Sequence, residues 1–139
     1  MNARGAGWTR VARFAALTAT VAFCLIVFGA FVRLSHAGLS CPDWPTCYGK
    51  ASWPGHEQEI ASANAAFPDR PVESHKTWRE QGHRMLAGTL GMMILALALV
   101  ATWRQKRELG LVLLASASAA LAIHLYRSDA HALSAICSI

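Results

Sequence analysis

Three long stretches without any Asp, Glu, Lys or Arg constrain this sequence more than any other feature. They span Phe14–Val32, Met85–Trp103 and Leu109–Tyr126, with lengths of 19, 19 and 18 residues. A helix of this length crosses about 30 Å of hydrocarbon, so each stretch predicts a membrane-spanning helix. Only 15% of the residues are charged, against about 25% in an ordinary soluble domain. We therefore predict an all-α integral membrane protein, part of a helical bundle, and exclude a soluble enzyme or a disordered chain.

These helices divide the chain into segments with predicted boundaries. The segments are a tail at 1–13, a span at 14–34, a loop at 35–80, a span at 81–103, a turn at 104–108, a span at 109–126 and a tail at 127–139. The loop contains all five prolines, and proline disfavours both sheet and helix interior. No proline occurs between Glu73 and Arg84, so we expect the second helix to begin before its apolar run.

The distribution of charge predicts an orientation. Basic residues lie before the first stretch and in the turn, namely Arg4, Arg10, Arg13, Arg104, Lys106 and Arg107. The loop carries four Lys and Arg against six Asp and Glu, a net charge of −2. Short basic segments mark the cytoplasmic side, so we expect a cytoplasmic N-terminus, a periplasmic loop and a cell inner membrane location. Membrane lipid is then a partner, and nucleic acid is not.

A cleaved secretory signal is the alternative interpretation of the first stretch. A basic start, an apolar core and the small residues around Ser35-His36-Ala37 fit such a signal. The core of a signal is usually about 7–15 residues, which is shorter than this stretch. The sequence therefore favours a membrane span over cleavage.

Cys41 and Cys47 bracket the segment Pro-Asp-Trp-Pro-Thr in the loop. An oxidising compartment permits a disulfide between them, and a structural disulfide is the favoured interpretation. A redox-active pair stays open as the alternative. The spacing differs from the two-residue gap of zinc knuckles and thioredoxin-like motifs, which disfavours a metal site.

Glu80 and His83 are three residues apart and would share a helix face. Ala87 and Gly91 continue from His83 in four-residue steps, leaving room for another helix or for a flat macrocycle. Histidine is a common axial ligand of heme iron. The alternative is that both polar residues lie at the aqueous interface and the small residues serve helix packing.

Two segments resemble the heme A synthase family. FVRLSHAGLSCPDWPTCYGK, at 31–50, resembles the first outer loop of that family. RPVE at 70–73 and KTWREQGHRMLAGTLG at 76–91 resemble its next signature. The resemblance runs from about Val11 to about Ser116.

The resemblance implies an oxidoreductase that converts a methyl group of heme O to the formyl group of heme A for cytochrome oxidase. Members have eight membrane helices in two four-helix bundles, with heme b as cofactor and heme O as substrate. His83 matches a ligand of heme iron, and Glu80 matches the acidic residue of the oxidation, by proton abstraction or by stabilising positive charge. Cys41 and Cys47 match the family's loop cysteine pair. Arg33 and Arg84 are expected partners of heme propionates.

The chain stops after the third expected helix, so we expect only the N-terminal part of such an enzyme, from a truncated or frame-shifted gene. The isolated chain is expected to be inactive, with heme O synthase or copies of itself as candidate partners. His124 and His131 receive no family role. Two other functions stay open. One is a membrane thiol–disulfide oxidoreductase that uses Cys41 and Cys47, and the other is a non-catalytic heme-binding or assembly protein.

Overall fold

The computed structural model describes residues 3–136 and contains, within them, helices and no strand. The helices are α1 (Ala3–Leu34), α2 (Glu57–Ala66), α3 (Ser74–Thr102) and α4 (Lys106–Ile136). Helical stretches long and apolar enough to cross a membrane occur at Thr9–Leu34, Ser74–Thr102 and Lys106–Tyr126. The prediction of an all-α, multi-pass membrane protein is confirmed. The side chains of Arg4 and His131 lie outside the described part of the chain.

The helices are longer than the apolar stretches that predicted them. α1 begins at Ala3 instead of Phe14, because the chain has no proline before position 42 to interrupt it. α3 begins at Ser74, soon after the last proline of the loop. α4 continues beyond Tyr126 to Ile136, into the expected tail. The loop also contains the ten-residue helix α2, which lies between Pro54 and Pro68.

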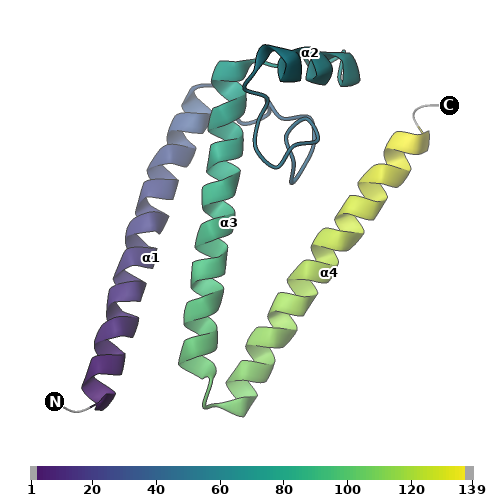
Figure 1. Cartoon of the computed structure of the whole chain (residues 1–139). Helices are drawn as coiled ribbons and strands as arrows, with labels where there is room; N and C mark the ends of the chain where they lie inside the picture. The colour runs from purple at the N-terminus through teal and green to yellow at the C-terminus, as the bar shows by residue number, and fades with distance from the viewer. Residues whose placement is uncertain (1–2, 137–139) are drawn as a thin grey trace. The chain divides into compact units, whose positions relative to one another are not determined.

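The chain forms two compact units, Met1–Ile94 and Leu95–Ile139. In the first unit, α1 and α3 run side by side, and the segment that connects them covers their shared end (Figure 1). The rings of Phe28 and Trp78 lie 6.3 Å apart between the helices. The guanidinium of Arg79 lies 4.9 Å from the ring centre of Phe31. Aromatic and cation–π contacts therefore join the two helices near the connecting segment.

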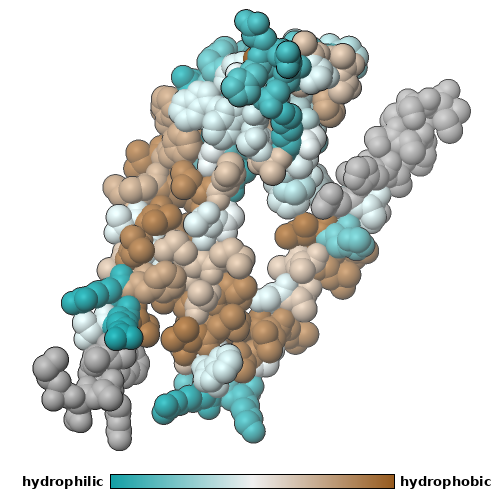
Figure 2. All heavy atoms as spheres, viewed as in Figure 1, coloured by the Kyte–Doolittle hydropathy of each residue, from teal (hydrophilic) through white to brown (hydrophobic). Residues whose placement is uncertain are grey.

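The apolar surface of the helices is almost entirely uncovered by the chain itself. Of the three apolar helix windows, that of α1 is 11% buried, and those of α3 and α4 are not buried at all. Figure 2 shows hydrophobic side chains along α1 and α3, and hydrophilic side chains over the connecting segment. Lipid chains or further helices must cover this surface, because contact between apolar side chains and water is unfavourable.

The end of α1 is fixed by a left-handed residue at its carboxyl terminus. His36 has φ of 52°, and its amide donates to the carbonyl of Arg33 at 3.1 Å. The amide of Ala37 donates to the carbonyl of Val32, also at 3.1 Å, which completes a Schellman motif. Val32 and Ala37 are both buried. The motif turns the chain back over the helix end.

The connecting segment has a small hydrophobic core of its own. Cys41, Cys47, Tyr48 and Ala63 are buried together, and Phe67 and Val72 pack against them. The hydroxyl of Tyr48 lies 3.1 Å from the carbonyls of Ser40 and Arg70 and 3.3 Å from that of Pro71. It therefore joins the beginning and the end of the segment. Burial raises the pKa of Tyr48 above its usual value.

The first turn of α2 is held by the carboxylate of Glu59. It accepts hydrogen bonds from the amides of Gly55 at 2.9 Å and His56 at 3.4 Å, and it pairs with Lys50. These donors lower the pKa of Glu59 to about 2, with the Lys50 hydrogen bond as the largest cause. Glu59 thus satisfies amides that no helical carbonyl can reach.

The first prediction concerns Tyr48 at alkaline pH. In a Tyr126→Phe variant, which leaves Tyr48 as the single tyrosine, tyrosinate absorbance should appear only above pH 10. Because the raised pKa favours the neutral phenol in the folded state, its contribution to stability is complete below about pH 10 and is lost as pH rises further. Tyr48→Phe should remove this alkaline transition and cost about 1 kcal/mol at neutral pH, measured by protease resistance of the segment. A Tyr48 titration below pH 10 would contradict the prediction.

Candidate functional site

Glu80 lies buried at the point where α3 passes beneath the connecting segment. Its residue surface is 5% exposed. One carboxylate oxygen, Oε2, accepts hydrogen bonds from the Ser40 hydroxyl at 2.9 Å and from the Cys41 amide at 2.8 Å. The other, Oε1, accepts from Arg84 at 2.6 Å. The negative charge is therefore both paired and hydrogen-bonded, which burial requires.

Arg84 and Gln81 bind the backbone of the same segment. Arg84 donates to Glu80 and to the carbonyls of Asp43 at 2.8 Å and Thr46 at 3.1 Å. The side-chain amide of Gln81 donates to the carbonyls of Pro45 at 3.2 Å and of Ala51 at 2.8 Å. One face of α3 is thus polar and buried. Glu80 and Gln81 follow Thr77 by three and four residues, and all three are buried.

Asp43 organises the segment that these side chains bind. Its carboxylate accepts from the amides of Tyr48 at 2.6 Å and Gly49 at 3.0 Å, and from the hydroxyl of Thr46. Tyr48 and Gly49 have φ of 54° and 73°, and the Trp44–Pro45 peptide is cis. The turn therefore depends on one partly buried set of hydrogen bonds to an aspartate.

A disulfide joins Cys41 and Cys47 across this turn, as the sequence predicted. Both residues are buried, with exposed fractions of 5% and 0%. The sulfurs are thus withdrawn from a partner thiol. Burial of this kind is typical of a structural disulfide, since redox-active cysteines are partly exposed.

His83 faces α1, away from the hydrogen-bond partners of Glu80. Its ring lies 6.0 Å from that of Phe28, edge to face. It also lies directly against Gly29, where a built Cβ would come within 2.8 Å of the imidazole. The room beside His83 therefore comes from Gly29 of α1. Ala87 and Gly91, the small residues that the spacing had indicated, are exposed on α3.

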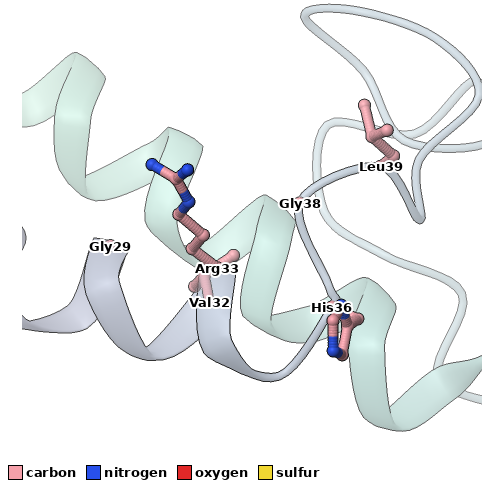
Figure 3. A pocket seen from close by; sticks show the side chains of 6 residues that line it. All are labelled: Gly29, Val32, Arg33, His36, Gly38 and Leu39. Carbon is pink, nitrogen blue, oxygen red and sulfur yellow. The ribbon is translucent and has the colours of Figure 1, made fainter.

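Arg33 lies at the end of α1, four residues after Gly29. With His36 and Leu39 it lines a shallow hollow of about 500 Å³. Figure 3 shows that the side chains of Arg33 and His36 point away from each other. Within residues 3–136, the guanidinium of Arg33 makes no hydrogen bond or ion pair. It is available to an anion, whereas the guanidinium of Arg84 is already engaged.

The structure brings together only some of the residues that the sequence singled out. Glu80, Arg84, Cys41 and Cys47 meet under the connecting segment. Ser40, Gln81 and Gly29 were missed, because their importance depends on contacts across 30 or more residues. The sequence indicates the tight turn only through Asp43, which lies between Pro42 and Pro45.

His83 is the described side chain best suited to hold a heme iron. Its ring is half-buried, and Nδ1 is buried without a hydrogen-bond partner in the described residues. The ring is therefore not committed to another polar group within the described part of the chain. An imidazole beside the ring of Phe28 and the backbone at Gly29 fits an axial heme ligand.

Comparison with known proteins assigns the chain to a family. The family model of COX15-CtaA, described as cytochrome oxidase assembly protein, matches residues 12–124. This chain belongs to the COX15-CtaA family. The match includes most of α1, the connecting segment and the whole of α3. The family resemblance inferred from the two sequence segments is confirmed.

Relatives of this COX15-CtaA protein carry the name heme A synthase. That of Shewanella oneidensis is 46% identical over 83 residues, which are 58% of this chain and 25% of the relative. That of Sinorhizobium fredii is 33% identical over 122 residues, which are 78% of this chain and 31% of the relative. The chain thus spans about a quarter to a third of the length of these relatives. No solved structure matches it.

The second prediction tests the contacts between α3 and the connecting segment. Arg84→Met should destabilise the segment by about 3 kcal/mol, because it leaves the buried Glu80 carboxylate without its counter-charge. Gln81→Ala should cost about 1 kcal/mol through two lost hydrogen bonds. The measurement is the rate of proteinase K cleavage within residues 43–55 in detergent.

Arg33→Met is the matched control, since it removes a guanidinium that has no protein partner in residues 3–136. Its cleavage rate should equal that of the unsubstituted chain. Equal rates for Arg33→Met and Arg84→Met would show that the Arg84 contacts do not hold the segment.

Proposed function

We propose that this chain supplies the first helices and outer loop of a heme A synthase, an oxidoreductase that converts the methyl group of heme O to the formyl group of heme A. The observation that carries the proposal is a buried Glu80 with both oxygens hydrogen-bonded, three residues before a half-buried His83 that makes no hydrogen bond to the described residues. Both lie within the part of the chain that matches the COX15-CtaA family. Heme O is the substrate in this proposal, and heme b is the cofactor of the complete enzyme.

Glu80 acts in this proposal as a fixed negative charge. Its oxygens accept hydrogen bonds from Ser40, Cys41 and Arg84, so both oxygens of the carboxylate are held in place by donors. Oxidation withdraws electrons from the methyl carbon, so positive charge develops at the edge of the macrocycle. A preorganised anion favours that charge. These donors support charge stabilisation more than proton abstraction.

His83 is proposed to hold heme iron. When bound, the heme iron supplies redox chemistry that no side chain provides. The protein's part is to present an uncommitted imidazole from α3 and to exclude water around it with Phe28 and the facing helix α1.

Arg33 is proposed to bind a heme propionate, since its guanidinium has no anionic partner in the described chain. It lies at the end of a membrane-spanning stretch, where long basic side chains reach the interface. Arg84 already commits three of its five guanidinium N–H groups to Glu80, Asp43 and Thr46. Its first role in this proposal is therefore to hold Glu80.

The third prediction tests the roles of Glu80 and His83. A chimera would carry residues 12–124 in place of the matching part of the Shewanella oneidensis heme A synthase. Glu80→Gln should retain heme but suppress heme A formation at least tenfold, because the amide keeps the size and one acceptor oxygen of the carboxylate but carries no negative charge. His83→Ala should lower heme occupancy, because it removes an iron ligand. Extracted heme O and heme A are counted for each variant.

Glu57→Gln is the control for Glu80→Gln, because Glu57 is exposed at the start of α2. It should leave the yield of heme A unchanged. A normal yield from Glu80→Gln would refute the catalytic role of Glu80. Heme binding without conversion in the unsubstituted chimera would favour the non-catalytic heme-binding alternative. The thiol–disulfide alternative is disfavoured by the burial of Cys41 and Cys47.

We further propose that the connecting segment lies in the periplasm and that the N-terminus and the α3–α4 turn are cytoplasmic, in the cell inner membrane. Arg10 and Arg13 precede the first apolar stretch, and three basic residues lie in 104–107, as the positive-inside rule expects. The disulfide between Cys41 and Cys47 supports an oxidising compartment for the segment.

The fourth prediction tests this orientation by cysteine labelling. In a background with Cys24 and Cys137 replaced by Ser, a single cysteine is introduced at Thr9 or at Ser52, both of which are exposed. A membrane-impermeant maleimide added to intact spheroplasts should label Ser52→Cys and leave Thr9→Cys unlabelled. Permeabilised cells are the control, in which both should react. Labelling of Thr9→Cys alone in intact spheroplasts would reverse the orientation.

A further inference from the structure

We propose that Gly29 of α1 is a positioning residue for His83, because the absence of a side chain at this point determines where the imidazole stands. A Cβ built on Gly29 would lie 2.8 Å from Cε1, 3.3 Å from Nε2 and 3.6 Å from Nδ1 of His83. The ring thus lies directly against the backbone of the facing helix. The functional meaning of this contact rests on the proposed role of His83 as a heme ligand.

Packing at Gly29 differs from packing at the glycines of α3. A Cβ at Gly82 would meet Phe28 at 3.9 Å, an ordinary contact, and one at Gly88 or Gly91 would meet nothing within 4 Å. Glycine within a helix is less favourable than alanine. At position 29 the close approach of His83 requires a residue without a side chain. At positions 88 and 91 no described neighbour imposes this requirement.

Packing has to orient His83 because hydrogen bonding does not. A metal-binding histidine usually donates its second ring nitrogen to an acceptor, which fixes the orientation of the ring. Nδ1 of His83 is buried and has no such partner among residues 3–136. The ring instead lies between the backbone at Gly29 and the edge-to-face ring of Phe28. Gly29 therefore supplies sterically what an acceptor would supply by hydrogen bonding.

Any side chain at position 29 must displace the imidazole. A separation of 2.8 Å between a Cβ and a ring carbon is not tolerated, and the ring is the part that can move. Loss of groups that orient a metal ligand lowers affinity by about 10–100-fold. Gly29→Ala should therefore weaken the binding of ferric heme by about tenfold, while Gly88→Ala should not change it.

The experiment, our fifth prediction, uses the full 139-residue chain in detergent micelles with histidine labelled by ¹³C at Cε1. His83→Gln assigns the His83 resonance. In Gly29→Ala this resonance should shift, because Cε1 is the atom nearest to the new methyl group. In Gly88→Ala it should stay in place. A second measurement titrates each variant with hemin and follows the Soret band and the low-spin signal.

The outcomes separate this proposal from the proposed function. An unmoved His83 resonance in Gly29→Ala overturns the positioning role, whatever the hemin titration gives. A shifted resonance supports it even if His83→Gln binds hemin normally, a result that would instead refute His83 as the heme ligand. If Gly29→Ala loses helical circular dichroism, the double variant with His83→Ala should recover it, because the overlap is gone. Failure to recover also overturns the proposal.

Discussion

The carboxylate of Glu80 is the point on which the arrangement of α3 and the connecting segment depends. A buried charge without partners is costly by several kcal/mol, so the chain must bring donors to it. Those donors come from two directions, Ser40 and Cys41 on the segment and Arg84 one turn along the same helix. Satisfying one charge therefore fixes the distance between the end of α1 and the start of α3.

Arg84 extends this constraint to the middle of the segment. A guanidinium has several donors in a fixed plane, and here they serve one carboxylate and two backbone carbonyls. A lysine could supply the charge but not this geometry. The same residue thus neutralises Glu80 and satisfies loop carbonyls that secondary structure leaves without partners.

The sequence predicted the membrane helices well, because a stretch of 18 or 19 residues without charge has few other uses. It also singled out Glu80 and His83, through spacing and family resemblance. It placed them on one face, however, while the structure turns Glu80 toward the connecting segment and His83 toward α1. Residues three apart on a helix differ in direction by about 60°. In a crowded site that difference is enough to separate two environments. The partner Ser40 could not be predicted, because it depends on the left-handed turn at His36.

The double attachment of the short disulfide ring has a consequence for how such sequences can vary in length. The amide of Cys41 is bound to Glu80 and the carbonyl of Thr46 to Arg84, so both ends of the ring meet neighbouring turns of one rigid helix. An insertion or deletion between them would have to break one attachment. Beyond Ala51, whose carbonyl accepts from Gln81, and the buried Pro54, residues 55–58 are exposed, and no hydrogen bond joins them to α3 within the described part of the chain. Length changes in the loop should therefore gather before and within α2, and the interval from Cys41 to Cys47 should stay constant.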